Sequence, residues 1–153
     1  MSSQLVPDFT LPATGGVVFK LSAARGKMLV IYFYPKDNTP GCTAESQQFR
    51  DLYRDFQKAD CEVAGISRDS IKSHENFKAR FSLPFELLAD TEETACELFG
   101  VIKLKNMYGK QVRGIERSTF VLDKNGVLRR EWRGIKADGH AQEVLQFVQN
   151  LST

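Results

Sequence analysis

The sequence predicts an α/β protein in which helices cover a mixed central sheet. Three observations predict this class. An apolar run at 27–34 is followed by an amphipathic segment and a second apolar run, which is the pattern of a parallel βαβ unit. The first run is apolar almost throughout, as in strands that are covered on both faces. Two hairpin patterns, one towards each end of the chain, add antiparallel strands.

Length and composition fit one globular domain over residues 1–153. Hydrophobic residues make up 42% and charged residues 26%, and the net charge of +2 is too small to argue for nucleic acid or a membrane surface. We find no signal-peptide pattern at residues 1–7 and no apolar run of transmembrane length. Three cysteines without such a signal predict free thiols in a reducing compartment, so we expect a cytoplasmic protein.

The first half of the chain predicts a hairpin, a turn, and then the βαβ unit. Residues 8–11 and 17–20 flank two glycines, which predicts a short N-terminal β-hairpin, and 21–26 form one capped turn. Residues 27–34 form the central strand. Residues 43 to about 58 are an amphipathic helical segment. Thr39 can cap this helix and Pro40 takes its first position, where the missing N–H of proline costs nothing. Residues 62–67 form the next strand.

The second half predicts two more helices, a strand and a hairpin. Ser70 caps a helix to about residue 81, residues 85–89 form a strand, and a short helix opens at Asp90 or Thr91 and ends at Gly100. Residues 101–114 follow no period and predict a loop with possible strand pieces. Residues 116–122 and 127–132 flank an Asn-Gly turn, and 140–151 form the last helix. This order predicts a thioredoxin-like three-layer α/β/α sandwich.

Cys42 stands where the central strand gives way to the first long helix. It falls in the first helical turn, among backbone N–H groups that have no intrahelical acceptor and at the positive end of the helix dipole. Such surroundings lower the pKa of a thiol and favour the reactive thiolate. The sequence therefore predicts a reactive cysteine here, rather than an inert thiol of the core.

The segment 32–45, Tyr-Phe-Tyr-Pro-Lys-Asp-Asn-Thr-Pro-Gly-Cys-Thr-Ala-Glu, closely resembles the peroxiredoxin active-site motif Pro-x-x-x-Thr/Ser-x-x-Cys. The similarity covers nearly the whole chain, including 7–9, 65–67, 99–101, 117–123 and 139–141. It is strongest to the AhpC/TSA-like subfamily of bacterioferritin comigratory protein, or peroxiredoxin Q. The resemblance implies a thiol peroxidase that reduces hydrogen peroxide and organic hydroperoxides in antioxidant defence, without a cofactor or a metal.

The resemblance also assigns roles to residues around Cys42. Cys42 matches the peroxidatic cysteine, whose thiolate attacks a peroxide oxygen and becomes a sulfenic acid. Thr39 matches the residue that orients peroxide and thiolate, Pro35 matches the residue that shields the sulfur, and Arg117 matches the arginine near it. A guanidinium and first-turn N–H groups, Gly41 included, suit this chemistry because they stabilise the thiolate and the oxygen on which charge develops.

The sequence departs from the family in the residues that would reduce the Cys42 sulfenic acid back to the thiol, which is the second half of the catalytic cycle. Many subfamily members carry a resolving cysteine five positions after the first, where this chain has Gln47, or on the following helix, which has no cysteine here. Cys61 and Cys96 are expected to be small buried thiols. We therefore favour a one-cysteine mechanism with an external reductant, which would be thioredoxin, glutaredoxin or a small thiol. The alternative is that Cys96, or Cys61, resolves Cys42.

A thioredoxin-like thiol–disulfide oxidoreductase or binding module is the rival function. Its Cys-x-x-Cys signature is missing, because Glu45 stands where the second cysteine should be. His74 and His140 show no metal-ligand spacing and are expected to be structural. The resemblance implies a monomer or a weak homodimer.

Overall fold

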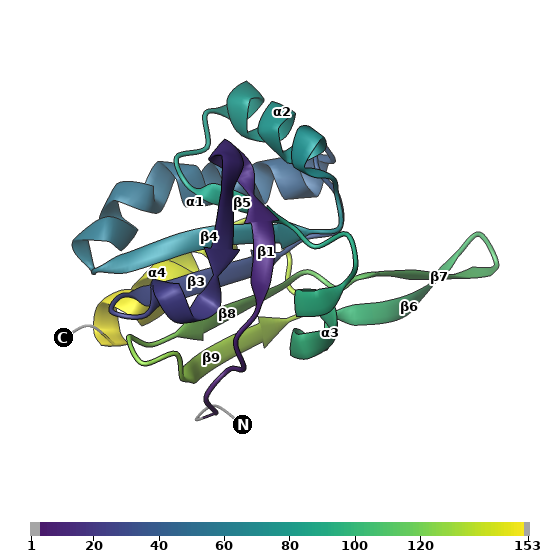
Figure 1. The fold of residues 1–153 in the computed structure, drawn as a ribbon. Helices are drawn as coiled ribbons and strands as arrows, with labels where there is room; N and C mark the ends of the chain where they lie inside the picture. The colour runs from purple at the N-terminus through teal and green to yellow at the C-terminus, as the bar shows by residue number, and fades with distance from the viewer. Residues whose placement is uncertain (1–3, 152–153) are drawn as a thin grey trace.

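A seven-stranded mixed sheet organises the computed structural model, which describes residues 4–151 (Figure 1). The sheet strands, in spatial order, are β2 (Val17–Lys20), β1 (Thr10–Ala13), β5 (Glu86–Ala89), β4 (Cys61–Ser67), β3 (Met28–Phe33), β8 (Ser118–Leu122) and β9 (Leu128–Arg133). The helices are α1 (Pro40–Lys58), α2 (Ile71–Phe81), α3 (Thr94–Phe99) and α4 (His140–Leu151), and β6 (Ile102–Met107) pairs with β7 (Lys110–Ile115) in a separate ribbon. The predicted fold class is confirmed.

The predicted βαβ unit forms the centre of the sheet. β3 and β4 are parallel, with Met28 opposite Cys61 and Phe33 opposite Ile66, and β5 continues the parallel set beyond β4. β8 joins the other edge of β3 in antiparallel orientation, and β1 is antiparallel to β5. The parallel strands therefore all end on one side of the molecule, where α1 begins.

Every residue of β3 is buried, as its apolar sequence predicts, and alternate residues enter two separate cores. Val30 and Tyr32 pack with α1, α2 and α4 on one face. Ile31 and Phe33 pack with α3 and the N-terminal segment on the other. The two helical layers are thus unequal, since the three longer helices share one face.

Residues 101–114, predicted as a loop with possible strand pieces, are mostly strand, so the loop was wrong and the strand pieces are confirmed. β6 and β7 form a hairpin that projects from the body as an arm (Figure 1), with a tight turn at Tyr108 and Gly109, both at positive φ. Most side chains of both strands are exposed, because the ribbon projects from the body and only its base, at Ile102 and Ile115, joins a core. Strands are usually recognised by alternating apolar residues, and a ribbon that buries few side chains does not need that pattern.

Several element boundaries also differ from the prediction, most by one or two residues. β1 occupies residues 10–13 rather than 8–11, because a short 3₁₀ turn at Thr14–Gly16 makes the connection to β2. β8 begins at Ser118 rather than 116. α3 begins at Thr94 rather than at 90 or 91, because Glu93 takes a positive φ and the Asp90 carboxylate accepts a hydrogen bond from the Cys96 N–H. Within residues 4–151, no helix has the length and apolar character needed to cross a membrane.

Candidate active site

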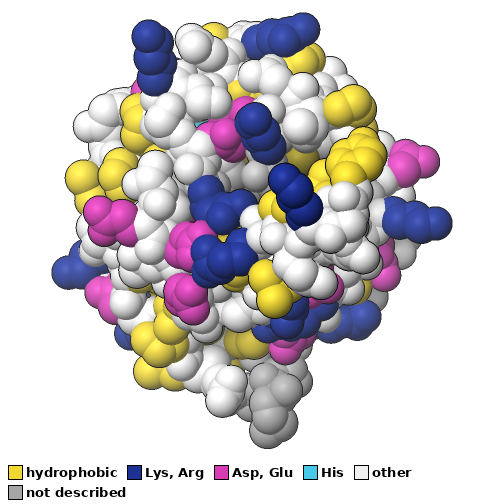
Figure 2. All heavy atoms as spheres, turned by 90° about the vertical axis from the view of Figure 1, so that its right-hand side faces the viewer, with side chains coloured by type: hydrophobic (Ala, Val, Ile, Leu, Met, Phe, Trp, Pro, Cys, Tyr) yellow, Lys and Arg dark blue, Asp and Glu magenta, His cyan; other side chains and the backbone are white. Residues whose placement is uncertain are grey.

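Cys42 lies in the first turn of α1, on the side of the molecule where the parallel strands end. Thr39 is at the N-cap and Pro40 at the first helical position, as predicted. Cys42 is only 1% exposed, so its thiol lies below the surface rather than on it. Figure 2 views this side and shows basic and acidic side chains mixed around a hollow.

Arg117 reaches Cys42 from the segment that leads into β8. Its Nη2 atom lies 3.4 Å from the Cys42 Sγ atom, and only 16% of its side chain is exposed. The antiparallel pairing of β8 with β3 explains this contact, because it places Ser118 opposite Phe33, shortly before α1 begins. The fold thus brings together two residues 75 positions apart in the chain.

Glu45 is a third member of this group, to which the sequence analysis gave no role. Its Oε1 atom accepts a hydrogen bond of 2.7 Å from Arg117 Nη1, and its side chain is fully buried. Oε2 has no hydrogen-bond partner within residues 4–151. The sequence did contain a sign of this role. A residue three positions after Cys42 lies on the same helix face, and a buried acidic side chain needs a cation as partner.

Burial and charge act in opposite directions on the Glu45–Arg117 pair. Burial raises the pKa of the Glu45 carboxyl to about 7, although the Arg117 guanidinium pulls it down. Burial alone would lower the pKa of Arg117, but the negative charges of Glu45 and Cys42 outweigh it and raise that pKa. Arg117 therefore stays a cation beside Cys42, whereas Glu45 changes charge near neutral pH.

Gly41 leaves the space that the guanidinium needs. A Cβ atom at this position would lie 3.1 Å from Arg117 Nη2, closer than ordinary van der Waals contact allows. The glycine backbone is helical here, so the requirement is for space and not for an unusual φ. The candidate role of Gly41 thus has a physical basis in the approach of Arg117 to Cys42.

The Thr39 hydroxyl does not cap α1, and the predicted cap bond was wrong. It donates instead to the Lys36 carbonyl at 2.9 Å, within the segment that links β3 to α1. Since its hydrogen is used there, its lone pairs can accept a hydrogen bond from a bound molecule. Pro35 is half-buried in the same segment. Helix geometry leaves the N–H groups of Gly41 and Cys42 without an intrahelical acceptor.

The other two cysteines lie away from Cys42. The 19 residues of α1 span about 28 Å, and Cys61 follows the far end of this helix. Cys96 belongs to the core on the opposite face of the sheet. Burial and neighbouring acidic groups raise the pKa of both thiols. A disulfide needs Cα atoms within about 7 Å, which places Cys61 out of reach of Cys42 in this fold.

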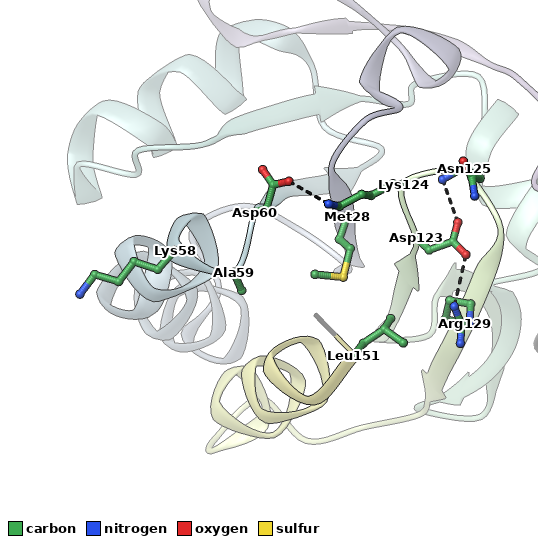
Figure 3. A pocket seen from close by; sticks show the side chains of 9 residues that line it. All are labelled: Met28, Lys58, Ala59, Asp60, Asp123, Lys124, Asn125, Arg129 and Leu151. Carbon is green, nitrogen blue, oxygen red and sulfur yellow. Dashed lines mark hydrogen bonds and ion pairs between the residues drawn. The ribbon is translucent and has the colours of Figure 1, made fainter. Parts of the chain in front are cut away.

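A cavity of about 440 Å³ lies at the far end of the sheet from Cys42 (Figure 3). Met28, at the start of β3, and the C-terminal ends of α1 and α4 border it. Four of its charged residues form two ion pairs, Asp60 with Lys124 and Asp123 with Arg129, each at 3.3 Å. None of the residues predicted for the site lines this cavity.

Comparisons with known proteins give the same assignment as the motif. Residues 3–131 match the model of the AhpC/TSA family. The chain is 52% identical to peroxiredoxin Bcp of Xanthomonas campestris over 90% of this chain and 86% of that protein. It is 47% identical to peroxiredoxin Bcp of Bacillus subtilis over 97% of this chain and 95% of that one.

Solved structures agree in fold. The X. campestris bacterioferritin comigratory protein, studied for its alkyl peroxide reduction activity, superposes with a TM-score of 0.91 at 48% identity, over 95% of this chain and 92% of that one. A mutant of Xylella fastidiosa PrxQ superposes with a TM-score of 0.94 at 38% identity, over 100% and 98% of the two chains. The chain therefore belongs to the AhpC/TSA family, in its group of Bcp and PrxQ peroxiredoxins.

Proposed function

We propose that this thiol peroxidase reduces hydroperoxides through the thiolate of Cys42. The observation that carries the proposal is the position of Cys42 Sγ, in the first turn of α1 and 3.4 Å from the Arg117 guanidinium. The sulfur attacks one peroxide oxygen and the O–O bond breaks. Cys42 becomes a sulfenic acid, and the departing oxygen takes a proton to leave as water or an alcohol.

The surrounding groups match each need of this step. Arg117 stabilises the thiolate and then the oxygen on which negative charge develops. The N–H groups of Gly41 and Cys42 add donors at the same point. The Thr39 lone pairs can accept the peroxide O–H hydrogen bond, because its own hydrogen goes to Lys36. Pro35 shields the sulfur from the solvent side in this proposal.

The substrate class follows from the site and its relatives. We propose that both hydrogen peroxide and organic hydroperoxides react, because the groups around Cys42 act on the O–O bond that both share. The alkyl peroxide activity described for the X. campestris relative supports the organic substrates. No metal or cofactor is required for the step.

For the second half of the cycle we propose an external thiol reductant. Thioredoxin, glutaredoxin or a small thiol would attack the sulfenic acid, release water as a mixed disulfide forms, and restore Cys42 by thiol–disulfide exchange. The burial of Cys61 and Cys96 and their places in the fold support this one-cysteine mechanism. The alternative, with Cys96 resolving, requires local unfolding of α1 or α3. We further propose that the protein works in the cytoplasm as a monomer or weak dimer.

Peroxide consumption with dithiothreitol as reductant tests the proposal. Cys42→Ser should abolish turnover, because no other thiol in the chain takes its place. Cys61→Ser and Cys96→Ser are the matched controls and should keep turnover with this small reductant. Retained peroxide consumption in the Cys42 variant would overturn the assignment.

A further inference from the structure

Asp37, in the segment that links β3 to α1, is the centre of a buried hydrogen-bond network. Its Oδ1 atom accepts from the Tyr34 hydroxyl at 2.7 Å. Its Oδ2 atom accepts from the Ser73 hydroxyl at 2.8 Å and faces His74 Nδ1 at 2.7 Å. Both Ser73 and His74 belong to α2, so this one carboxylate ties the linking segment to another helix.

His74 is fully buried, and both of its ring nitrogens face oxygen acceptors. Nε2 lies 2.9 Å from the Leu88 carbonyl in β5, which can only accept, so Nε2 carries a hydrogen. Nδ1 faces Asp37. If that carboxylate is ionised, Nδ1 also carries a hydrogen and the ring is a cation.

The state of Asp37 decides between a neutral pair and an ion pair. Burial by itself would raise the pKa of the Asp37 carboxyl, but hydrogen bonds and charge from His74, with the Tyr34 and Ser73 hydroxyls, outweigh it and lower the pKa. An ionised Asp37 can only accept at its contact with His74, so the shared hydrogen would lie on His74 Nδ1. With both ring nitrogens engaged, His74 has no lone pair for a metal, although Asp37, Asp69 and His74 stand close together.

The network reaches the peroxide-reducing site through the backbone next to Asp37. The Asp37 N–H donates to Asp69 Oδ2 at 2.8 Å, and the preceding carbonyl, that of Lys36, accepts the Thr39 hydroxyl at 2.9 Å. These two groups belong to the same peptide unit. Asp69 thus holds this peptide from its N–H side, and the Thr39 hydroxyl binds it from its carbonyl side. The side chain of Asp37 anchors the same peptide to α2, so a shift of Asp37 would also shift the Thr39 hydroxyl.

We propose that the buried His74–Asp37 ion pair is a positioning device for peroxide reduction, which holds the linking segment so that Thr39 and the first turn of α1 face the peroxide correctly. The inference rests on the proposed role of Cys42. Neither residue touches the substrate in this account. Each acts through the backbone of residues 35–39.

Two rates, for oxidation of Cys42 by peroxide and for its alkylation by iodoacetamide, distinguish a positioning role from a general effect on stability. The rate of Cys42 oxidation by peroxide should fall about tenfold or more in Asp37→Asn and in His74→Gln, since small misplacements of reacting groups are that costly. Alkylation of the reduced thiol by iodoacetamide needs no oriented peroxide and should change far less. Lys78→Ala is the matched control on the same helix, because it removes the 2.8 Å ion pair with Glu86 without touching Asp37 or a side chain bonded to it. It should leave peroxide oxidation at the wild-type rate.

Nitrogen NMR of the His74 ring gives a readout that activity alone would not. Both ring nitrogens should carry protons at neutral pH in the wild-type protein, and Asp37→Asn should abolish this state. A neutral ring in the wild-type protein, wild-type oxidation rates in a folded Asp37 or His74 variant, or equal slowing in Lys78→Ala would each overturn the proposal. Tyr34→Phe provides a further variant if His74→Gln does not fold. A wild-type protein that reduces peroxide without oxidising Cys42 would instead overturn the proposed function.

Discussion

Single residues around Cys42 act through the position of one guanidinium. Arg117 divides its two terminal nitrogens between a thiol and a carboxylate, at 3.4 Å and 2.7 Å. Gly41 leaves room for one of these contacts, and the buried Glu45 fixes the other. A change at Gly41 should therefore act mainly on the chemistry, whereas a change at the buried Glu45 should also act on stability.

Gly41→Ala should slow peroxide reduction while leaving the protein folded. The new Cβ atom would stand 3.1 Å from Arg117 Nη2 and push the guanidinium away from Cys42. We expect the second-order rate with peroxide to fall about tenfold or more. The unfolding free energy should stay equal or rise by about 0.5–1 kcal/mol, because alanine is the better helix former. Stopped-flow kinetics and urea denaturation measure both, and an unchanged rate would contradict the account.

Glu45 should make the stability of the protein fall as the pH rises from about 4.5 to about 7. Its folded pKa of about 7 lies above the ordinary value of 4.5, so in this range the folded protein keeps a proton that the unfolded chain has lost. The difference corresponds to roughly 3 kcal/mol across the window. Urea denaturation at several pH values should show this loss in the wild-type protein and a flatter profile in Glu45→Gln. Parallel profiles would contradict the raised pKa.

At the scale of elements, the close packing of β3 against β4 depends on a glycine. Gly65 lies opposite Tyr32, and a Cβ atom there would stand 2.8 Å from the tyrosine ring and 2.9 Å from Leu87. Gly65→Ala should therefore cost about 1–3 kcal/mol of unfolding free energy by overpacking. Denaturant titration measures the loss. Wild-type stability would show that the tyrosine ring can move aside.

Ion pairs add to the core contacts at the base of the β6–β7 arm and join it to the body. Arg113 pairs with Glu93 at 2.8 Å, and Glu93 also pairs with Arg68 at 3.0 Å. These two arginines lower the pKa of Glu93 to about 2. A two-stranded ribbon is marginally stable without such support. Arg113→Ala should thus speed amide hydrogen exchange in β6 and β7 without changing the melting temperature much.

Lys110→Ala is the matched control for the arm. Lys110 lies on the same strand and forms no ion pair within the part of the chain that the structure describes. Its replacement should leave hydrogen exchange in β6 and β7 as in the wild-type protein. Equal acceleration in both variants would mean that the ion pair with Glu93 does not hold the arm.

At the scale of the whole molecule, the sequence predicted the features that depend on local pattern. The apolar run of β3, the stripe of α1 and the Asn-Gly turn before β9 each carry their own signal, and their arrangement as a parallel βαβ unit with an added hairpin follows. The position of Cys42 at a helix start was equally local. The contact with Arg117 needed the family resemblance, because no local rule joins residues 75 positions apart.

Features that depend on tertiary partners escaped the sequence analysis. Glu45 and His74 gain their importance from Arg117 and Asp37, which lie 72 and 37 positions away in the chain. The arm escaped for a different reason, since a ribbon with two exposed faces needs no alternating pattern. Buried charges and unburied strands are the two cases in which hydrophobic patterning gives no guidance.

In the proposed mechanism Cys42 alone is oxidised by the peroxide. Mass mapping of all three cysteines after one equivalent of peroxide, with a trap for sulfenic acid, tests it most directly. The account predicts trapped sulfenic acid at Cys42 with Cys61 and Cys96 unmodified. A peptide bridged between Cys42 and Cys96, or an unmodified Cys42 after the peroxide is consumed, would contradict it.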